Sequence, residues 1–333
     1  MRGLRIVLWI VAIGALLGGV GLYLAGQFND APGMTFGMLL LMASFAVYAV
    51  PLLGIAALTA AGMLLTPRTK RIRPAVVLVL ALALLPLAAW RYLPLYSANA
   101  EPSSGAQKVT VMTANLRMGQ SDMGVVLNKA RLYQADIVVL QEVTPQAWEI
   151  ARGAADVLRY YGYHAGEAQP GVFGTMILSR TDLPNAQPVA VSNRGFMATT
   201  DLGGPIRVIG VHTTPPNNAA AWRQDFATIT QTVQAGSEPT IMAGDFNATI
   251  DHRAMRDMLA TTGLVDAVDA CGSGWQPTWP TPGSGGLRGL APVPLVPIDH
   301  VFFSSHFACV DTQIVDLEFT DHRAVVAVLT RKG

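Results

Sequence analysis

Charged residues are scarce in this chain of 333 amino acids. Only 14% are Asp, Glu, Lys or Arg, 51% are hydrophobic, and the mean hydropathy is +0.37. An ordinary soluble domain has about 25% charged residues, so the deficit argues against a wholly soluble protein and indicates membrane segments. The chain is also too long for one average domain.

Acidic residues are nearly missing from the first 100 positions, where Asp30 is the only one. This part carries seven Lys or Arg residues and a net charge of +6, whereas residues 101–333 carry 16 basic and 21 acidic residues and a net charge of −5. The overall charge of +1 therefore conceals two bodies of different character.

Three stretches of the first body lack charge almost completely, at about residues 6–26, 34–65 and 74–95, and only Arg91 near the end of the third interrupts them. A spanning helix needs about 20 apolar residues, and in hydrocarbon a helix satisfies its own backbone. The sequence therefore predicts three transmembrane helices, which would attach the protein to a lipid bilayer.

Two other interpretations of the apolar stretches are disfavoured by what is missing. A cleaved signal peptide is the alternative for the first stretch, but two further spans follow it and no small-x-small cleavage site is evident. A transporter or sensor is the alternative for all three, but ion pathways usually need polar groups inside the spans. We interpret the three helices as an anchor.

The basic residues predict the orientation of this anchor. Arg2 and Arg5 precede the first span, and four basic residues lie at positions 68–73, between the second and third spans. The positive-inside rule then places the amino terminus in the cytoplasm. Three crossings of the plasma (inner) membrane put everything after Leu95 outside the cytoplasm. Dividing residues 34–65 into two short helices would put the basic loop outside, and we disfavour it.

Cysteine is nearly absent, with Cys271 and Cys309 as the only two. Outside the cytoplasm this pair could form a disulfide. Two unpaired thiols are the alternative, because the sequence does not give the distance that such a bond requires.

The second body alternates between strand-like and helix-like segments, without an internal repeat, after a small and polar linker at 97–107. Strands mixed with helices predict a layered α/β domain. The expected division is an anchor at 1–96, the linker, and a domain at 108–333. The expected strands are 108–114, 136–141, 174–179, 189–191, 206–212, 239–244, 298–303, 310–317 and 324–329, and the expected helices are 123–134, 144–160 and 218–234.

An acid and an amide side chain end two of these strands. Glu142 follows the run Ile-Val-Val-Leu-Gln, and Asn115 ends the preceding strand. Mg²⁺ takes one or two carboxylates and keeps waters and substrate oxygens in its other positions, so Glu142 is a candidate ligand, and Asn115 could add an amide oxygen. Taken singly, each residue is also typical of a solvated strand end or a turn.

The tetrapeptide Gly244-Asp245-Phe246-Asn247 follows another apolar run. In an extended chain Asp245 and Asn247 point to the same face. The carboxylate can orient or deprotonate an attacking water, the amide can donate to a phosphoryl oxygen, and the glycine lets the backbone approach closely. Alone, the tetrapeptide could be an ordinary turn.

Two histidines occupy similar places. His322, before the last strand, can stabilise the charge that develops on phosphoryl oxygens, and Asp299 is the candidate partner that fixes its tautomer. His212 ends the strand at 206–212 and could protonate the leaving oxygen. A single histidine is more often structural. Asp321, directly before His322, is a fourth carboxylate beside Glu142, Asp245 and Asp299. Two histidines and four carboxylates at or beside strand ends indicate a site for metal-assisted attack on a phosphoester.

As an ordered set, these motifs resemble those of the endonuclease/exonuclease/phosphatase superfamily, which includes pancreatic-type deoxyribonucleases and neutral sphingomyelinases. The resemblance runs over residues 108–329 and includes Pro277-Thr278-Trp279-Pro280. It implies a four-layer α/β/β/α sandwich of two mixed β-sheets flanked by helices. It also implies Mg²⁺, or in some members Mn²⁺, at Glu142 with Asn115 and Asp321.

The resemblance further implies a role for each remaining group. Asp245 would act on the water and Asn247 on the phosphate. Asp299 would support His322, and His212 would lie near the scissile group. Two features depart from the family, because no carboxylate partner of His212 is apparent and the active-site tyrosine of some nucleases has no counterpart here.

Clustered Lys and Arg residues are missing from residues 101–333, although nucleic-acid binding usually needs such a cluster. A lipid or small phosphodiester is therefore favoured over DNA as the substrate, with Arg117, Arg194 and Arg288 as candidates for binding it. Tethering near a bilayer would raise the effective concentration of lipid headgroups. An extracytoplasmic endonuclease is the alternative enzyme, and a non-catalytic binding module on the same fold is the alternative from another class. No protein partner can be inferred.

Overall fold

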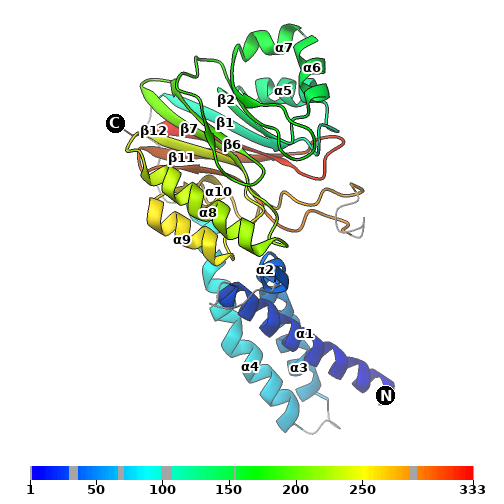
Figure 1. Cartoon of the computed structure of the whole chain (residues 1–333). Coiled ribbons are helices and arrows are strands. Elements are labelled where there is room, and N and C mark those ends of the chain that lie inside the picture. The colour runs from blue at the N-terminus through cyan, green and yellow to red at the C-terminus, as the bar shows by residue number, and fades with distance from the viewer. Residues whose placement is uncertain are drawn as a thin grey trace. The chain divides into compact units, whose positions relative to one another are not determined.

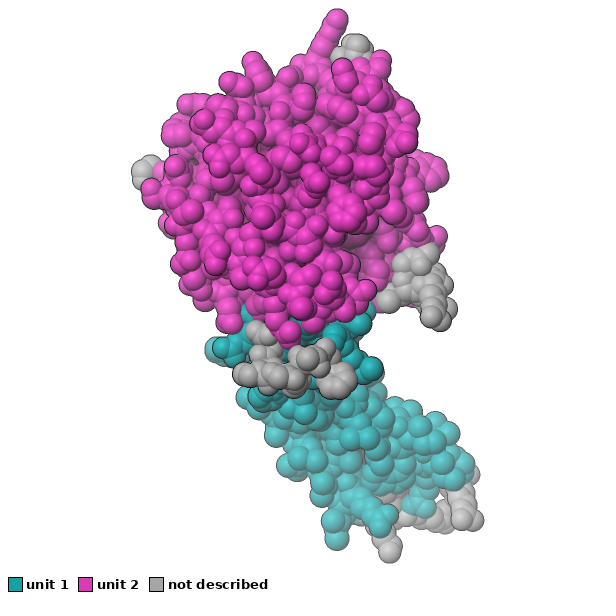
Figure 2. Space-filling model, in the orientation of Figure 1, with its two compact units in different colours: residues 1–93, 250–253 teal, residues 94–249, 254–333 magenta. Residues whose placement is uncertain are grey.

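The computed structural model describes residues 2–29, 37–66, 71–98, 107–153, 155–284 and 291–332. The chain divides into two compact units (Figure 2), of which unit 1 comprises Met1–Leu93 with Ile250–Arg253, and unit 2 comprises Pro94–Thr249 with Ala254–Gly333. The expected linker at 97–107 falls largely outside the described residues, as do two of the four basic residues at 68–73.

Unit 1 is built from apolar helices, and three of its helical stretches, Gly3–Phe28, Ala46–Leu64 and Ile72–Tyr92, are long and apolar enough to cross a membrane. The helix expected at 34–65 is interrupted, because the N–H of Phe45 bonds three residues back instead of four. The helices are α1 (Arg2–Phe28), α2 (Gly37–Ala43), η1 (Ala46–Tyr48), α3 (Ala49–Leu64), α4 (Ile72–Ala89) and η2 (Trp90–Tyr92).

Small residues let the helices of unit 1 approach closely. A Cβ on Gly19 of α1 would lie 2.9 Å from Leu53 Cγ of α3. Ala56 of α3 and Ala81 of α4 are fully buried in one cluster. Between helices in lipid, association depends on van der Waals packing of this kind, which small side chains permit. The packing therefore suits a bundle that lies in a bilayer.

A buried ion pair lies within unit 1. The carboxylate of Asp251 has no exposed surface, and it accepts from Arg91 Nη1 at 2.8 Å and from the Tyr92 hydroxyl at 2.8 Å. Asn29 holds the same segment by its backbone, since it donates to the Asp251 carbonyl at 3.0 Å and accepts the Arg253 N–H at 2.9 Å. Arg91, the charged residue that interrupts the third apolar stretch, is thus paired with the carboxylate of Asp251.

The Arg91→Met substitution should destabilise the protein, because it removes the cation that lies 2.8 Å from the buried Asp251 carboxylate, at a cost of about 3–5 kcal/mol. Thermal unfolding of the full chain in detergent measures this. Arg152→Met is the matched control, since Arg152 forms an exposed pair with Glu149 at 3.0 Å, and such pairs contribute at most about 1 kcal/mol. Equal unfolding temperatures for the two variants would contradict the prediction.

Unit 2 contains two six-stranded sheets, in the orders β11-β12-β1-β2-β4-β3 and β5-β6-β7-β8-β10-β9. Parallel pairs, β1 with β2 and β7 with β8, stand beside antiparallel ones, so both sheets are mixed. The strands are β1 (Lys108–Asn115), β2 (Ile137–Gln141), β3 (Tyr163–Glu167), β4 (Thr175–Ser179), β5 (Gln187–Val189), β6 (Gly195–Asp201), β7 (Pro205–His212), β8 (Thr240–Asp245), β9 (Val265–Asp266), β10 (Asp299–Phe303), β11 (Phe307–Val315) and β12 (Ala324–Arg331).

Helices cover the outer faces of the sheets (Figure 1). Three lie over the first sheet, α5 (Met123–Leu132), α6 (Pro145–Gly153) and α7 (Ala155–Tyr160), whereas α8 (Ala219–Gln234) and α9 (Arg253–Thr262) lie on the side of the second. The remaining short helices are η3 (Pro94–Tyr96) and α10 (Ala267–Ala270). Asn218 caps α8, and its side chain accepts the Ala221 N–H. The α/β/β/α sandwich predicted from the sequence is confirmed.

Alternation of side chains along the strands builds two cores. Val111 of β1 joins Val208 of β7 in the cluster between the sheets, whereas Met112 joins the cluster beneath the helices of the first sheet. The sheets approach closely at Gly210, where a Cβ would lie 2.9 Å from Val139 Cγ1. This close approach brings the ends of strands from both sheets within reach of one another.

The strands β3, β6 and β9 were missed in the sequence. β3 lies at the edge of its sheet and buries only one of its five residues, so it shows no clear alternation of apolar and polar side chains. β6 mixes glycine and threonine with apolar residues, and β9 has only two residues. Strands of this kind form because neighbouring strands pair with them, and their own sequences signal them weakly.

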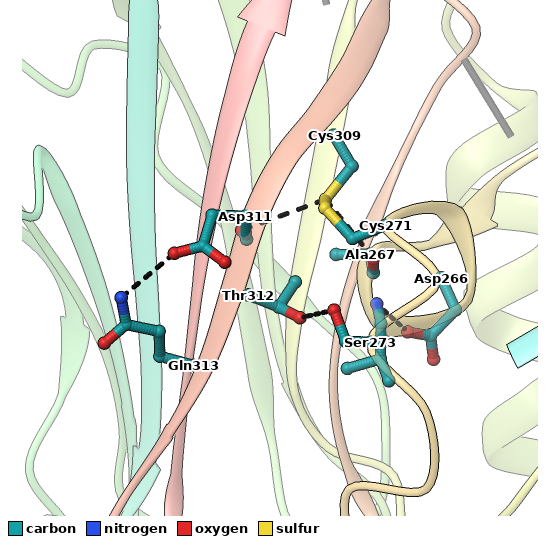
Figure 3. The surroundings of a disulfide bond; sticks show 9 residues. Asp266, Ala267, Cys271, Ser273, Cys309, Asp311, Thr312 and Gln313 are labelled. Atoms are coloured by element: carbon teal, nitrogen blue, oxygen red, sulfur yellow. Dashed lines mark hydrogen bonds between the residues drawn. A yellow bond between two sulfur atoms is a disulfide. The ribbon is translucent and has the colours of Figure 1, made fainter. Parts of the chain in front are cut away.

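Cys271 and Cys309 form a disulfide (Figure 3), with a Cα–Cα distance of 5.3 Å. Cys309 lies on β11 and Cys271 follows α10, so the bond joins segments that are 38 residues apart in the chain. Beside it, Thr312 Oγ1 donates to Ser273 Oγ at 2.6 Å. Of the two alternatives that the sequence left open, the structure has the paired one.

Candidate active site

The polar strand ends that the sequence singled out converge between the two sheets. β1 and β2 run parallel and end together, so Asn115 and Glu142 leave the first sheet side by side. β7 and β8 also run parallel, with His212 opposite Asp245, and antiparallel β10 begins with Asp299 opposite the same residue. Strand register therefore gathers these groups within each sheet, and the packing of the two sheets brings the two sets together.

Asn115 links the two sheets at this point. Its Nδ2 donates to Glu142 Oε1 at 3.1 Å and to Asp245 Oδ2 at 3.0 Å. Its Oδ1 accepts the Arg117 N–H at 2.8 Å. In this arrangement the Asn115 side chain is a buried donor that bridges two carboxylates.

Glu142 enters the site from a left-handed backbone conformation, with φ of 58°. Its Oε2 accepts the Met118 N–H at 2.6 Å. Arg117, Met118 and Asn247 also have positive φ, at 50°, 51° and 47°. Non-glycine residues rarely adopt this region, and such residues cluster at functional sites. Four uncommon backbone conformations therefore mark the same place as the carboxylates.

His322 lies between two carboxylates. Its Nδ1 is 2.9 Å from Asp299 Oδ2, and its Nε2 is 3.7 Å from Asp245 Oδ2. Burial alone would lower the pKa of His322, but the charges of Asp299 and Asp245 outweigh burial and raise that pKa to about 10. His322 is therefore a buried imidazolium at neutral pH, with both ring nitrogens protonated.

Asp245 occupies the centre of the site. Its Oδ1 accepts the Asn247 N–H at 2.9 Å, and its Oδ2 faces Asn115 and His322. Burial and the neighbouring charge of Asp299 raise the pKa of Asp245 to about 7, although the charge of His322 acts in the opposite direction. A carboxylate whose pKa lies near neutrality can take up a proton at working pH, as a general base must.

The structure supplies the partner of His212 that the sequence did not show. Nδ1 lies 3.1 Å from the Val172 carbonyl oxygen, which can only accept, so this nitrogen carries a hydrogen. Nε2 faces Asn193 Nδ2 at 3.4 Å and Asp245 Oδ2 at 3.6 Å. Burial lowers the pKa of His212 against the opposing charge of Glu142, which favours the neutral form of the ring. Its role as proton donor to the leaving oxygen stays a prediction.

Each residue of the Gly-Asp-Phe-Asn segment makes a contact that holds the segment in position. A Cβ on Gly244 would lie 1.9 Å from the Val211 carbonyl oxygen, so only glycine permits the close backbone approach expected there. Phe246 is fully buried and packs edge-on against Phe302 with ring centroids 4.9 Å apart. Asn247 Nδ2 donates to a backbone carbonyl, that of Thr213, at 2.9 Å. Its neighbours in the chain thus hold Asp245 in place.

Asp321 is engaged by partners outside this group. Trp279 Nε1 donates to Asp321 Oδ2 at 3.2 Å, and Arg117 Nε lies 3.7 Å from Oδ1. Thr278 Oγ1 accepts the Asp299 N–H at 3.2 Å. The Pro-Thr-Trp-Pro segment therefore positions two acids of the site, one through a backbone and one through a side chain.

The three arginines considered for substrate binding have different positions. Arg117 adjoins the site through its own N–H and its side chain, as described above. Arg194 pairs with Glu167 Oε2 at 3.2 Å, and its carbonyl accepts the His212 N–H at 3.3 Å. Arg288 lies outside the described residues.

Two further residues support the site and were missed in the sequence. Thr320 Oγ1 donates to the Asn115 carbonyl at 2.8 Å and accepts the His322 N–H at 3.1 Å. Asp225 of α8 accepts backbone N–H groups at Ser192 and Thr214. Thr320 adjoins the Asp-His pair, so the sequence held a weak signal for it. Asp225 sits on a helix far along the chain, and nothing in its sequence context marked it.

His300 forms a buried pair behind the site. Its Nδ1 lies 2.6 Å from Asp266 Oδ2, and its Nε2 donates to the Ala248 carbonyl at 2.9 Å. Burial acts to lower the pKa of His300, but Asp266 outweighs it and the pKa is raised. The pair thus holds the backbone just after Asn247 through the bond from His300 Nε2 to the Ala248 carbonyl.

The raised pKa of His300 predicts a specific pH dependence of stability. The folded protein binds this proton more tightly than the unfolded chain, so the stabilisation is complete below the ordinary histidine pKa of about 6.5 and is lost as pH rises through the folded pKa. The difference in free energy of unfolding between the parent and His300→Gln should therefore shrink above about pH 6.5. Denaturant titrations from acidic to alkaline pH measure it, with exposed His306→Gln as the control. A difference independent of pH would refute the assignment.

The acids of the site fit a divalent cation. Asp245, Asp299 and His322 offer ligand atoms that lie within 4.8 Å of one another. Asp299 Oδ1 is buried and has no hydrogen-bond partner among the described residues. The protonated ring of His322 has no lone pair to give, so the carboxylates are the groups of this site that suit a hard cation.

Comparison with models of known protein families identifies the family of this chain. The model of the Endonuclease/Exonuclease/phosphatase family matches residues 112–322, more than half of the sequence. The chain therefore belongs to this family, and it is an enzyme, a metal-dependent phosphoric ester hydrolase of the phosphodiesterase or nuclease type. A search of the curated proteins gave no match.

Solved structures share the fold at low identity. The endonuclease/exonuclease/phosphatase from Beutenbergia cavernae is 20% identical over 68% of this chain and 72% of its own, with a TM-score of 0.51. D. rerio TDP2 complexed with single strand DNA product is 14% identical over 67% and 99%, with a TM-score of 0.55. A Bacteroides vulgatus member is 15% identical over 68% and 99%, with a TM-score of 0.52.

Proposed function

We propose that this chain is a membrane-anchored, Mg²⁺-dependent phosphodiesterase that hydrolyses a lipid or small phosphodiester. The observation that carries the proposal is one contact network, in which Asn115 bridges Glu142 and Asp245 while His322 faces Asp245. Acid, amide and imidazolium groups are thus held within a few ångströms of one another. These are the groups that hydrolysis of a phosphoester by water requires.

Glu142 is the proposed principal ligand of the cation, with Asn115 and Asp321 beside it. When bound, Mg²⁺, or Mn²⁺ in its place, would supply Lewis-acid stabilisation of charge on the phosphoryl oxygens. The Met118 N–H and the Asn115 amide fix the Glu142 carboxylate, so it is oriented before any ligand arrives.

Asp245 is the proposed base, which orients the attacking water and accepts its proton as the oxygen adds to phosphorus in line with the leaving group. Its pKa of about 7 matches that task. Asn247 would donate an amide hydrogen to a phosphoryl oxygen. The His322 imidazolium would stabilise the negative charge that grows there, and Asp299 keeps the ring oriented through Nδ1.

His212 is the proposed group nearest to the leaving oxygen. Because Nδ1–H is committed to the Val172 carbonyl, Nε2 is the nitrogen that can pick up a proton and deliver it. Burial lowers the pKa of this ring, so its protonated form would be a strong acid and would release the proton readily.

The proposed location is the plasma (inner) membrane, with the amino terminus in the cytoplasm and the catalytic domain on the other side. Three stretches are apolar enough to span, and the basic residues favour this orientation. The disulfide between Cys271 and Cys309 supports the outside location, because such bonds persist in oxidising compartments.

Hydrolysis of bis-p-nitrophenyl phosphate by the full-length protein in detergent tests the activity. We expect release of p-nitrophenolate with Mg²⁺, loss of it with EDTA, and recovery when excess Mg²⁺ is restored. Turnover that is unchanged by EDTA would contradict the proposed dependence on a metal ion. If folded protein binds Mg²⁺ but shows no turnover, a non-catalytic binding module would be favoured.

A nuclease is the second candidate. It is motivated by the likeness in fold to TDP2, whose structure contains a single strand DNA product. Plasmid DNA and phospholipid vesicles offered to the same preparation at physiological salt separate the two. Degradation of the DNA without hydrolysis of lipid would reverse the preference for a lipid or small substrate.

A further inference from the structure

A cleft of about 660 Å³ adjoins the proposed catalytic centre. Small-molecule sites usually measure about 300–1,000 Å³, so this volume can hold part of a substrate. Two lining residues also hold the centre itself, because the Arg117 N–H donates to Asn115 Oδ1 and Thr320 Oγ1 donates to the Asn115 carbonyl. A substrate whose phosphorus lies at the centre would therefore extend one of its ester groups into this cleft.

The walls of the cleft are of two kinds. Arg117, Gln120, Thr281 and Ser284 supply polar groups, and Asp316 adds a carboxylate whose Oδ1 accepts from Arg323 Nε at 2.7 Å. Among the described residues Arg117 pairs only with Asp321, at 3.7 Å, so its guanidinium keeps donors for a phosphate oxygen. A cleft lined by both the Arg117 guanidinium and the Phe319 ring suits a ligand in which a phosphate group is joined to a hydrocarbon chain.

Phe319 supplies the apolar wall. Its side chain is 74% exposed although it is a large hydrophobic residue, and its backbone has φ of 59°. The next residue, Thr320, is almost fully buried and bonded to both Asn115 and His322. The ring is thus exposed to solvent next to a residue that is bonded to the site, and a ligand that covered the ring would remove apolar surface from water.

Two more exposed apolar side chains stand on loops that belong to the site. Met118, 47% exposed, donates its N–H to Glu142, and Phe173, 46% exposed, follows the residue whose carbonyl binds His212. Apolar side chains therefore recur on the segments whose backbone groups, the Met118 N–H and the Val172 carbonyl, contact Glu142 and His212.

We propose that this cleft is the subsite for the hydrocarbon-bearing ester group of a lipid phosphodiester, with Phe319 against the hydrocarbon and Arg117 on a phosphate oxygen. The inference rests on the proposed function and names the substrate class of that same site. A nucleoside is the competing occupant, but nucleic-acid sites rely on several positive charges. Here residues 101–333 carry a net charge of −5, and only one cation lines the described part of the cleft.

Three p-nitrophenyl phosphodiesters test the inference, because they share one leaving group and differ only in the other ester: methyl, octyl and 5′-thymidyl. Full-length protein in detergent with Mg²⁺ should hydrolyse the octyl ester with a higher kcat/KM than the methyl ester. Phe319→Ala should reduce the octyl-to-methyl ratio roughly tenfold, as expected for loss of a buried phenyl contact. Phe319→Leu should restore most of the ratio.

Leu132→Ala is the matched control, because Leu132 is 81% exposed and does not line the cleft. It should leave the ratio and the activity unchanged. Equal rates for the octyl and methyl esters overturn the inference alone, and a preference for the thymidyl ester that Phe319→Ala removes overturns it in favour of a nucleic acid. Failure to hydrolyse even the methyl ester overturns the proposed function as well.

Discussion

Asp245→Asn should lower kcat for bis-p-nitrophenyl phosphate by about 10³-fold, because the substitution removes the group proposed to take the proton from water. Its size and shape are kept, so the substitution opens no cavity. The amide also cannot act as a base at any accessible pH, so activity should not return when the pH is raised. Steady-state rates between pH 5 and 9 measure both effects.

The same variant should not lose stability, and this separates a catalytic from a structural role for Asp245. Burial and the charge of Asp299 raise its pKa to about 7. The ionised form therefore opposes folding at pH 8, and the neutral amide removes that opposition. In the presence of EDTA we expect the unfolding temperature of Asp245→Asn to equal or exceed that of the parent. Exposed Asp311→Asn serves as the control, and a catalytic loss that is accompanied by unfolding would count against the assignment.

Glu142→Gln should abolish the stabilisation that Mg²⁺ confers. Binding to the folded state alone adds about 2.7 kcal/mol at a ligand concentration 100-fold above Kd, so the parent should unfold at a higher temperature with Mg²⁺ than with EDTA. In Glu142→Gln the two temperatures should coincide, because the neutral amide is a poor ligand for a hard cation. This readout does not depend on turnover.

Activity should fall in parallel, by about 10²-fold or more, since loss of a metal that stabilises the transition state costs several kcal/mol. Glu149→Gln is the control, because Glu149 lies exposed on α6 and pairs with Arg152 only at the surface. An undiminished response to Mg²⁺ in Glu142→Gln would contradict the role of Glu142 and favour the carboxylates of Asp245 and Asp299 as the ligands.

Residues with a strong local signal were predicted well. The apolar runs located the helices of unit 1, because length and lack of charge alone decide whether a helix can span a bilayer. Strands β1, β2, β7, β8 and β12 were found because each is a β-branched run followed or preceded by polar residues. Glycine before Asp245 was expected to permit close backbone approach, and the structure places the Val211 carbonyl there.

Groups without a local signal were not predicted. Asn193 and the Val172 carbonyl meet His212 only because two loops come together with the end of β7. The position of a backbone carbonyl is also not marked by any residue type in the sequence. The break between α2 and η1 lies in an uncharged stretch. Hydropathy does not indicate it, because the break is a change in the spacing of backbone hydrogen bonds and not in composition. The ion pair of Asp251 with Arg91 joins positions 160 residues apart, so no local pattern indicated it.

By itself, the sequence determined the family, the layered α/β architecture, the apolar amino-terminal helices and the polar groups that end the strands. These depend on periodicity, composition and motif order, which are properties of neighbouring residues. Only the tertiary structure decided that Asn115 bridges two carboxylates, that the pKa of His322 is raised while that of His212 is lowered, and that Cys271 pairs with Cys309. Those outcomes depend on burial and on distances between remote segments, which arise when the two sheets pack together.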